Sequence, residues 1–369
     1  MSGQQHSGNK RKTHFVFRAT FRLLLIFAGI AMALSYISVY INPDTFALPL
    51  FFGLYFIPIL IINLLLLLVA LIRRSKSAWI PVAVLLPALM FTDLFFKIGS
   101  ESSTDIEGIK LKIESYNVGT FSASKGKESR DECRAKVVRH IRQVNPDIVC
   151  FQEFYVNTPA QADSLFPGYP YKYHHLFKVR NGKYFGNLII SRFPIVSTGK
   201  ISFPRSTNLS IYADIDHFGR IIRIYNNHLE SYNISFTSLV QKLSKATKIS
   251  GDEIKNDIKT VHEKMRGTFI KRSQQVNRIL ENIAGSSHPA IICGDFNDTP
   301  MSFTYHMLAK ERKDSFKESG KGFGATFIPL WPLLRIDYIL YPKEFGSISH
   351  QTHKIKLSDH YPISSEIII

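Results

Sequence analysis

Three long apolar stretches dominate the first part of the chain. Leu23–Ile41 and Ala47–Ile72 contain no charged residue, and each is long enough to cross about 30 Å of hydrocarbon as a helix. A third stretch, Ala78–Phe96, has a similar length but contains two prolines and the charge of Asp93. We predict three transmembrane helices, the third being the weakest. A cleaved secretory signal would be the alternative for the first stretch, but no small-residue cleavage site follows it.

Basic residues flank these stretches on one side only. Lysine and arginine are retained on the cytoplasmic side of a membrane. The segment Asn42–Phe46 has none, whereas the other flanks hold Lys10, Arg11, Lys12, Arg18, Arg22, Arg73, Arg74 and Lys76. We therefore predict a multi-pass protein of a bacterial inner membrane, with a cytoplasmic amino terminus and everything after Phe96 facing the periplasm or exterior. If the third stretch does not span, this orientation inverts.

The rest of the chain alternates short β-type runs with turns and a few helices. The runs are 111–116, 148–151, 187–191, 211–215, 221–226, 290–293, 338–340 and 364–369. Cys133–Val144 is typical of an amphipathic helix. This pattern predicts an α/β domain of two packed sheets with helices outside. We divide the chain into a basic N-terminus (1–22), a membrane domain (23–98), a polar linker (99–108) and a globular domain (109–369).

The formal charge is +17, and the first 98 residues hold nine basic and two acidic side chains, which leaves +10 for the remainder. This surplus suits an anionic partner such as nucleic acid or phospholipid headgroups, or a position beside an acidic membrane surface. Many of the charges lie in the helix-like region Tyr232–Asn282, where a solvated helix is favoured over a basic arm that holds substrate. Cys150 and Cys293 lie in apolar runs, which predicts buried, unpaired thiols.

Polar side chains able to bind metal flank several of the β-type runs. Asp295 and Asn297 follow Pro289–Cys293 and project from the same side of the chain, while Gly294 permits a close backbone approach. Three further runs are flanked in the same way, by Asn117, by Glu153, and by Asp359 with His360. Together these positions predict a single site.

The domain from about Lys110 to Ile369 resembles the endonuclease/exonuclease/phosphatase superfamily, as a membrane-anchored bacterial member. The segments that carry the resemblance occur in the family's order: Ser115–Asn117, Asp147–Glu153, Gly186–Pro194, Asn227–Leu229, Gly294–Asn297, Arg335–Tyr338 and Ser358–His360. The resemblance implies a four-layer α/β sandwich of two mixed sheets, with the site at one edge of the sheets.

Phosphoester cleavage explains the types of residue at this site. Mg²⁺ (or Mn²⁺) prefers one or two carboxylates and keeps several waters, so Glu153 with Asn117 is the expected inner pair. The resemblance adds Asp359 to this metal seat. Asn187 is the less secure expectation of a contact with substrate phosphate.

The catalytic roles also follow from the resemblance. Asp295 is the base that deprotonates the attacking water, and Asn297 holds a transition-state oxygen. His228 and His360 donate to phosphate oxygens as imidazolium ions, and Asp337 orients and charges His360. Taken alone, Asp337 could instead form an ion pair with Arg335.

These observations predict a metal-dependent phosphoester hydrolase, first a nuclease or general phosphodiesterase. A phosphodiesterase or phosphatase acting on lipid headgroups of its own bilayer is the alternative, and a non-catalytic binding module ranks below both. The expected partners are a phosphoester substrate and the lipid bilayer, and the sequence implies no obligate protein partner. Fold and metal core do not identify the substrate.

Overall fold

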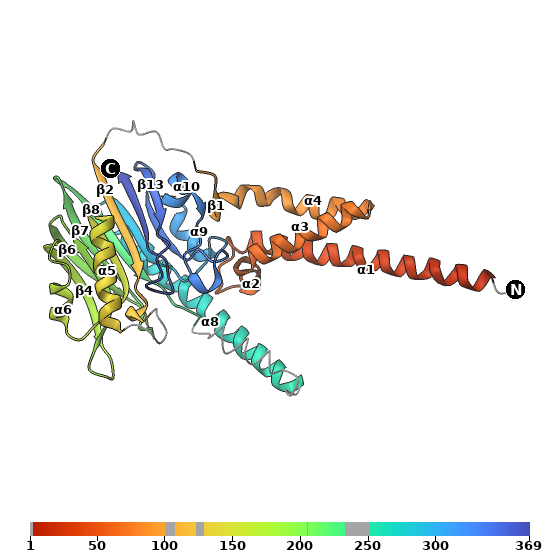
Figure 1. Cartoon of the computed structure of the whole chain (residues 1–369), viewed down its shortest axis with the longest axis horizontal. Coiled ribbons are helices and arrows are strands. Elements are labelled where there is room, and N and C mark those ends of the chain that lie inside the picture. The colour runs from red at the N-terminus through yellow and green to blue at the C-terminus, as the bar shows by residue number, and fades with distance from the viewer. Residues whose placement is uncertain (1–2, 100–107, 123–128, 205, 233–250) are drawn as a thin grey trace.

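The computed structural model describes residues 3–99, 108–122, 129–204, 206–232 and 251–369. Figure 1 shows apolar helices extending from one side of a globular domain, with the amino terminus at their far end. These helices, here called the membrane segment, are α1 Gly3–Ile37, α2 Leu48–Leu54, α3 Phe56–Ile72, η1 Lys76–Ala78, α4 Trp79–Leu85 and η2 Leu86–Leu94.

The membrane segment differs in one respect from the expected three continuous helices. Within the described chain, Phe15–Ile37 and Lys76–Leu94 are each long and apolar enough to cross a membrane, and a third crossing exists only if α2 and α3 count together. The axes of α2 and α3 differ by 74°. Pro58 explains the break between them, because it lacks an N–H and its ring clashes with the carbonyl of Leu54 one turn earlier. The stretch with the clearest sequence signal is therefore the bent one.

The globular domain contains two stacked mixed sheets, which confirms the predicted fold class. Among the described residues, sheet 1 has the order β10-β12-β9-β8-β7-β6 and sheet 2 the order β13-β14-β2-β3-β5-β4. In each sheet one pair is parallel, β8 with β9 and β2 with β3, and the other pairs are antiparallel. Buried isoleucines from both sheets, including Ile113, Ile211 and Ile291, fill the space between them.

The strands of sheet 1 are β6 Ile195–Ser202, β7 Leu209–His217, β8 Arg220–His228, β9 Ala290–Asp295, β10 Arg312–Asp314 and β12 Asp337–Pro342. The strands of sheet 2 are β2 Lys110–Asn117, β3 Ile148–Val156, β4 Tyr171–Lys178, β5 Tyr184–Ser191, β13 Gly346–Thr352 and β14 Ile363–Ile368. Every predicted run falls on one of these strands, with 364–369 extending one residue beyond β14, and β4, β6, β10 and β13 were not predicted. The thiols of Cys150 and Cys293 are buried and free, as expected.

Helices cover the outer faces of both sheets. The remaining elements of the described residues are η3 Gly119–Phe121, α5 Arg130–Val144, α6 Pro159–Ser164, α8 Gly251–Ala284, α9 Phe303–Ala309, α10 Ser315–Ser319, β1 Phe96–Lys97, β11 Gly322–Phe323 and η5 Ile328–Leu330. Helix α5 begins with a capping box between Ser129 and Glu132 and ends at Asn145, which adopts the left-handed conformation before Pro146. Part of the predicted basic region, 233–250, lies outside the described residues.

The membrane segment and sheet 1 share one apolar core. A single buried cluster contains Met32, Phe56, Leu94, Tyr225 and Ile292. Polar contacts reinforce it, since Ser38 Oγ donates to the carbonyl of Met301 at 2.8 Å and Arg335 Nη1 donates to that of Leu94 at 3.2 Å. The globular domain therefore docks against the ends of α1 and η2 and is not merely tethered to them (Figure 1).

Candidate functional site

The ends of four strands bring predicted polar residues to one edge of the sheets. Asn117, His228 and Asp295 are the last residues of β2, β8 and β9. Asp295 pairs in register with His228 on one side and with Asp337, the first residue of β12, on the other. Parallel strands end at the same edge, which explains why residues so distant in sequence meet.

Asp295 lies at the centre of this cluster and is buried. Its Oδ2 accepts hydrogen bonds from Asn117 Nδ2 at 2.9 Å and from Asn297 Nδ2 at 3.2 Å, while its Oδ1 accepts one from the Asn297 backbone N–H at 2.8 Å. Burial raises the pKa of Asp295 to about 6, and the charge of Asp337 adds to this increase, while His360 and His228 oppose it. The pKa of this carboxyl is therefore shifted towards neutral pH.

His360 and Asp337 form a buried pair beside Asp295. His360 Nδ1 donates to Asp337 Oδ2 at 2.9 Å, and His360 Nε2 lies 3.8 Å from Asp295 Oδ2. Burial alone would lower the pKa of His360, but Asp337 and Asp295 outweigh it and hold this pKa well above its usual range. The ion pair between Asp337 and Arg335 that the sequence left open does not form, because Arg335 pairs with Asp314.

His228 and Glu153 lie close to each other beside Asp295. His228 Nε2 is 3.6 Å from Glu153 Oε1 and 3.9 Å from Asp295 Oδ2. Burial is the largest influence on His228 and lowers its pKa, which favours the neutral ring over the expected imidazolium. A neutral ring still donates a hydrogen bond from one nitrogen.

Glu153 occupies a strained position at the register shift between β3 and β5. Its φ angle is 52°, a left-handed conformation that costs about 1–3 kcal/mol for a residue other than glycine. Strain of this kind persists at functional sites because the surrounding fold enforces it. The bulge turns the carboxylate towards Asn117, whose Nδ2 lies 3.5 Å from Glu153 Oε1.

The loop after β9 depends on Gly294 and Asn297. Gly294 has a φ of 134°, and a Cβ there would lie 2.0 Å from the carbonyl oxygen of Asn227, so only glycine fits. Asn297 has a φ of 53°, and its Nδ2 also donates to the Leu229 carbonyl at 2.9 Å. The fold thus fixes the orientation of the Asn297 amide.

Two predicted residues lie at the margin of the cluster. Asp359 is exposed and accepts a hydrogen bond from Ser358 Oγ at 3.2 Å, and its carboxylate is close enough to raise the pKa of Glu153, although burial contributes more. Asn187 is buried, and its Nδ2 donates to the carbonyls of Leu209 and Asn226 at 3.2 and 3.3 Å. The amide nitrogen of Asn187 therefore bridges the two sheets.

Two buried side chains near the site were missed by sequence reasoning. The guanidinium of Arg272, on α8, donates to the carbonyl of Asn297 and lies 3.6 Å from Asp298 Oδ2. Asn226 joins the sheets through its Nδ2, which donates to the carbonyls of Phe151 and Leu188. Arg272 is one of many basic residues between Tyr232 and Asn282. Only its position on the buried face of α8 distinguishes it from the others. The only indication in the sequence that Asn226 lies near the site is that it directly precedes Asn227 and His228.

The site has the donors that a divalent cation requires. Ligand atoms of Asp295, Asp337 and His360 lie within 4.8 Å of one another. Asp337 Oδ1 is buried without a hydrogen-bond partner, and in the described part of the chain neither Glu153 nor Asp359 pairs with a lysine or arginine. Unneutralised carboxylates gathered around amide oxygens fit a hard cation.

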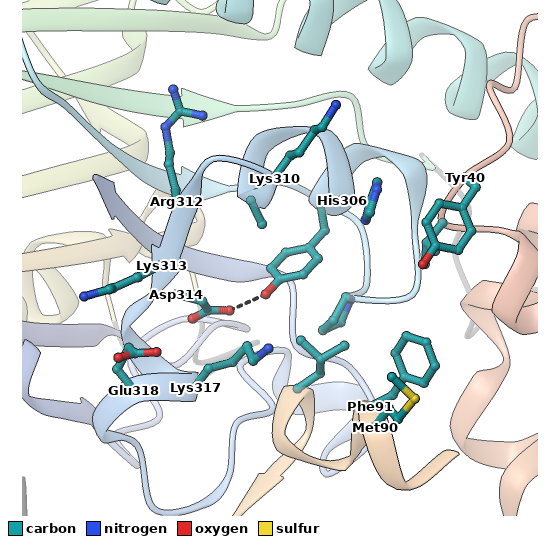
Figure 2. A pocket seen from close by; sticks show the side chains of 15 residues that line it. Tyr40, Met90, Phe91, His306, Lys310, Arg312, Lys313, Asp314, Lys317 and Glu318 are labelled. Atoms are coloured by element: carbon teal, nitrogen blue, oxygen red, sulfur yellow. Dashed lines mark hydrogen bonds between the residues drawn. The ribbon is translucent and has the colours of Figure 1, made fainter. Parts of the chain in front are cut away.

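A cavity of about 350 Å³ lies elsewhere, between the membrane segment and the globular domain. Figure 2 shows Tyr40, Met90 and Phe91 on its membrane side, opposite Lys317 and Asp314. Asp314 accepts a hydrogen bond from Tyr305 Oη at 2.7 Å. No predicted site residue lines this cavity. It is a feature of the junction between the two parts of the chain.

Comparisons with known proteins agree with this geometry. The model of the Endonuclease/Exonuclease/phosphatase family matches residues 115–360, and that of a domain of unknown function (DUF8431) matches residues 18–93. Two stacked mixed sheets with acidic, amide and imidazole groups at one edge are the architecture of a phosphoesterase. The chain belongs to the Endonuclease/Exonuclease/phosphatase family, and its general chemistry is phosphoester hydrolysis.

Solved structures share the fold at low sequence identity. An endonuclease/exonuclease/phosphatase from Beutenbergia cavernae DSM 12333 has a TM-score of 0.53 and 17% identity, covering 70% of this chain and 72% of that one. A protein of the same description from Bacteroides vulgatus has a TM-score of 0.53 and 16% identity, covering 71% of this chain and 99% of that one. A family protein from Bacteroides thetaiotaomicron has a TM-score of 0.52 and 15% identity, covering 72% of this chain and 99% of that one. The comparison with curated proteins gave no match.

Proposed function

We propose that the protein is a divalent-metal-dependent phosphodiester hydrolase with Asp295 as its general base. The observation that carries this proposal is the convergence of Asn117, Glu153, His228, Asp337 and His360 around the buried Asp295 carboxylate. Two imidazoles and three acidic or amide groups around one carboxylate support acid–base chemistry on an anionic substrate.

Glu153, Asn117 and Asp359 would hold the cation, Mg²⁺ or Mn²⁺. When bound, the ion neutralises charge on the phosphate and polarises its oxygens. The Asn117 amide is already fixed, because its Oδ1 accepts the N–H of Gly119 at 3.0 Å and its Nδ2 donates to Asp295. A cation would require this amide to turn its oxygen inwards. The Glu153 carboxylate needs no such change, since its nearest partners are a histidine ring and an amide.

Asp295 would take the proton of the attacking water. Its two hydrogen bonds from Asn297 fix the plane of the carboxylate, and a pKa of about 6 leaves it ionised at neutral pH yet basic enough to accept a proton. His360, kept protonated by Asp337, would donate from Nε2 to a phosphate oxygen as negative charge grows there. His228 would donate to a second oxygen as a neutral ring.

The test is a panel of phosphoesters offered to the full-length protein in detergent. We expect hydrolysis of a nitrophenyl phosphodiester or an oligonucleotide that a chelator abolishes, and no turnover by Asp295→Ala with substrate binding retained. A protein that hydrolyses no phosphoester and takes up neither Mg²⁺ nor Mn²⁺ would be the non-catalytic binding module instead.

Nucleic acid and lipid headgroups remain the two substrate classes for this reaction, and one observation favours lipid. Four residues beyond Asn297, the Met301 carbonyl contacts Ser38 at the end of α1 and limits the space beside Gly53 of α2. The catalytic loop therefore lies against the membrane segment, where headgroups are the nearest phosphoesters. Release of a soluble headgroup from vesicles, with oligonucleotides left intact, is the expected result for a lipid hydrolase.

We further propose that the membrane domain (23–98) and linker (99–108) hold the catalytic domain (109–369) on the periplasmic or exterior side of a bacterial inner membrane. The basic residues between α3 and α4 lie at the opposite end of the membrane segment from the globular domain, which supports this orientation (Figure 1). A reporter fused after Ile369 should be active only outside the cytosol. Cytosolic activity would invert the topology.

A further inference from the structure

A second cluster of acid and imidazole side chains lies on the face of sheet 2 that α5 covers. Glu114 of β2, His140 of α5 and His353, which follows β13, each offer one ligand atom, and these atoms lie within 4.8 Å of one another. His140 Nε2 is 2.8 Å from Glu114 Oε1, and the two imidazole ring centroids are 5.0 Å apart. Three separate parts of the chain thus bring two histidines and a carboxylate together.

The Glu114 carboxylate is incompletely satisfied by the protein. It is fully buried, and its Oε2 has no hydrogen-bond partner. The nearby Lys112 does not pair with it, because Lys112 Nζ donates to the carbonyl of Val144 at 2.5 Å. Burial raises the pKa of Glu114, and His140 and Lys112 act against this increase. An unpaired buried oxygen costs free energy unless another group binds it.

We propose that Glu114, His140 and His353 form a structural site for a transition-metal dication of the zinc class, with a water molecule as the fourth ligand. Two histidines and one glutamate with a water in the fourth position are a donor set that zinc uses in enzymes. Here Glu114 and His140 are buried, so we assign the site a structural role. Zinc bonds of about 2.0–2.1 Å place tetrahedral ligand atoms about 3.3 Å apart. The contact between Glu114 and His140 needs only a small opening to reach this separation, and His353 must move inwards.

His353 is suited to that movement and to metal binding. It is half-buried, so one side of the ring is free of core packing. Ser364 Oγ lies 2.8 Å from its Nε2 and orients the ring, as groups behind a metal ligand commonly do. Burial, with smaller contributions from His140 and Lys112, lowers the pKa of His353 to about 4, so the ring is neutral and can bind a cation at neutral pH.

The site would stabilise the fold and not take part in the reaction. An ion here would tie β2 and α5, which the contact between Glu114 and His140 already joins, to the segment after β13. Glu114 lies three residues before Asn117 on β2, so the ion would also brace the strand that carries an active-site residue. This site is independent of the cation proposed for Glu153, because it shares no ligand with it.

Cobalt(II) titration of the full-length protein in detergent separates the two sites. A four-coordinate site with two imidazoles gives an intense visible band, whereas an oxygen-rich octahedral site gives a weak one. We expect one equivalent of Co²⁺ to produce the intense band, Zn²⁺ to displace it and to raise the melting temperature, and Glu153→Gln to retain both effects.

The decisive variants are Glu114→Gln and His353→Asn. Both should lose the intense band and the rise in melting temperature with Zn²⁺. Because Glu114 is fully buried and its variant could misfold, the half-buried His353→Asn decides the outcome if Glu114→Gln is not recovered. The proposal is overturned if the wild-type protein gives no intense band with Co²⁺, or if His353→Asn keeps the band and the thermal shift.

Discussion

Replacing Asp337 with asparagine should inactivate the enzyme while leaving its shape intact. Asp337 is buried, accepts the Nδ1–H of His360 at 2.9 Å, and is the carboxylate that raises the pKa of His360 most strongly. Asparagine has the same size and can still accept that hydrogen bond. The substitution therefore removes mainly one negative charge.

The size of the effect follows from the separation of the two charges. A carboxylate and an imidazolium about 4 Å apart attract by about 4 kcal/mol at an effective dielectric constant of about 20. Removing the Asp337 charge therefore lowers the pKa of His360, so the neutral ring becomes more populated as the pH rises. Losing one charged donor to the transition state lowers kcat by about 10²–10³-fold.

The assay is the rate of hydrolysis of a nitrophenyl phosphodiester from pH 6 to 9 with Mg²⁺ present. The expected result is a large fall in kcat, a smaller change in KM, and a loss that grows with pH as the neutral ring becomes dominant. Asp214→Asn is the matched control, because Asp214 is also buried and pairs with Arg223 at 2.7 and 2.8 Å, outside the catalytic cluster. It should lower stability and leave kcat near wild type. A kcat for Asp337→Asn within threefold of wild type across this range would refute the role given to the pair.

Three further predictions concern stability and positioning. Gly53→Ala should lower the melting temperature in detergent much more than Gly29→Ala. A Cβ at Gly53 would lie 2.2 Å from the Met301 carbonyl oxygen, whereas a Cβ at Gly29 would meet its nearest neighbour at 3.4 Å. Equal decreases in melting temperature would contradict this prediction. Arg272→Met should reduce kcat about tenfold with little change in KM. The reason is that a charge-assisted hydrogen bond to the Asn297 carbonyl is worth about 1.5–3 kcal/mol. An unchanged kcat would show that the loop does not need the hydrogen bond from Arg272. Burial lowers the pKa of His350 to about 3, so the folded protein favours the neutral ring. The free energy of unfolding should therefore decrease as the pH falls below about 6.5, by up to about 2 kcal/mol at pH 5. His350→Gln should flatten this pH dependence in thermal unfolding.

Much of the fold could be predicted from the chain because its strands are short, apolar and bounded by turns. Strands β3 and β9 begin with the continuous apolar runs Ile148–Phe151 and Ala290–Cys293, which is typical of strands buried on both faces. Strands β4 and β6 were missed because most of their side chains are partly or fully exposed at sheet edges, where lysines, serines and histidines weaken the hydrophobic pattern. Order along the sheet cannot be obtained from such local signals.

The membrane segment shows the limit of hydropathy as a guide. The stretch Ala47–Ile72 is the longest uncharged one, yet it bends at Tyr55 because hydropathy does not register the backbone effect of Pro58. The bend directs α2 against α8, where Phe51 contacts Phe269 edge to face. Only tertiary structure reveals that contact.

The candidate site was predictable to the extent that each residue ends a strand. Asn117, His228 and Asp295 terminate strands in parallel pairs, so their convergence follows from the fold. The strained Glu153 bulge and the buried Arg272 depend on long-range packing that leaves no local pattern. The charge state of His228 likewise depends on its burial, which reverses the expectation of an imidazolium.

The most direct test of the account is the hydrolysis of a phosphodiester by the full-length protein in the presence of Mg²⁺, by wild type and by Glu153→Ala. We predict turnover by the wild-type protein that ceases with chelator and returns with added Mg²⁺ or Mn²⁺, and none by Glu153→Ala even though that variant unfolds at a normal temperature. Turnover that persists in chelator, or in Glu153→Ala, would contradict the central claim that a cation held by this cluster drives the reaction.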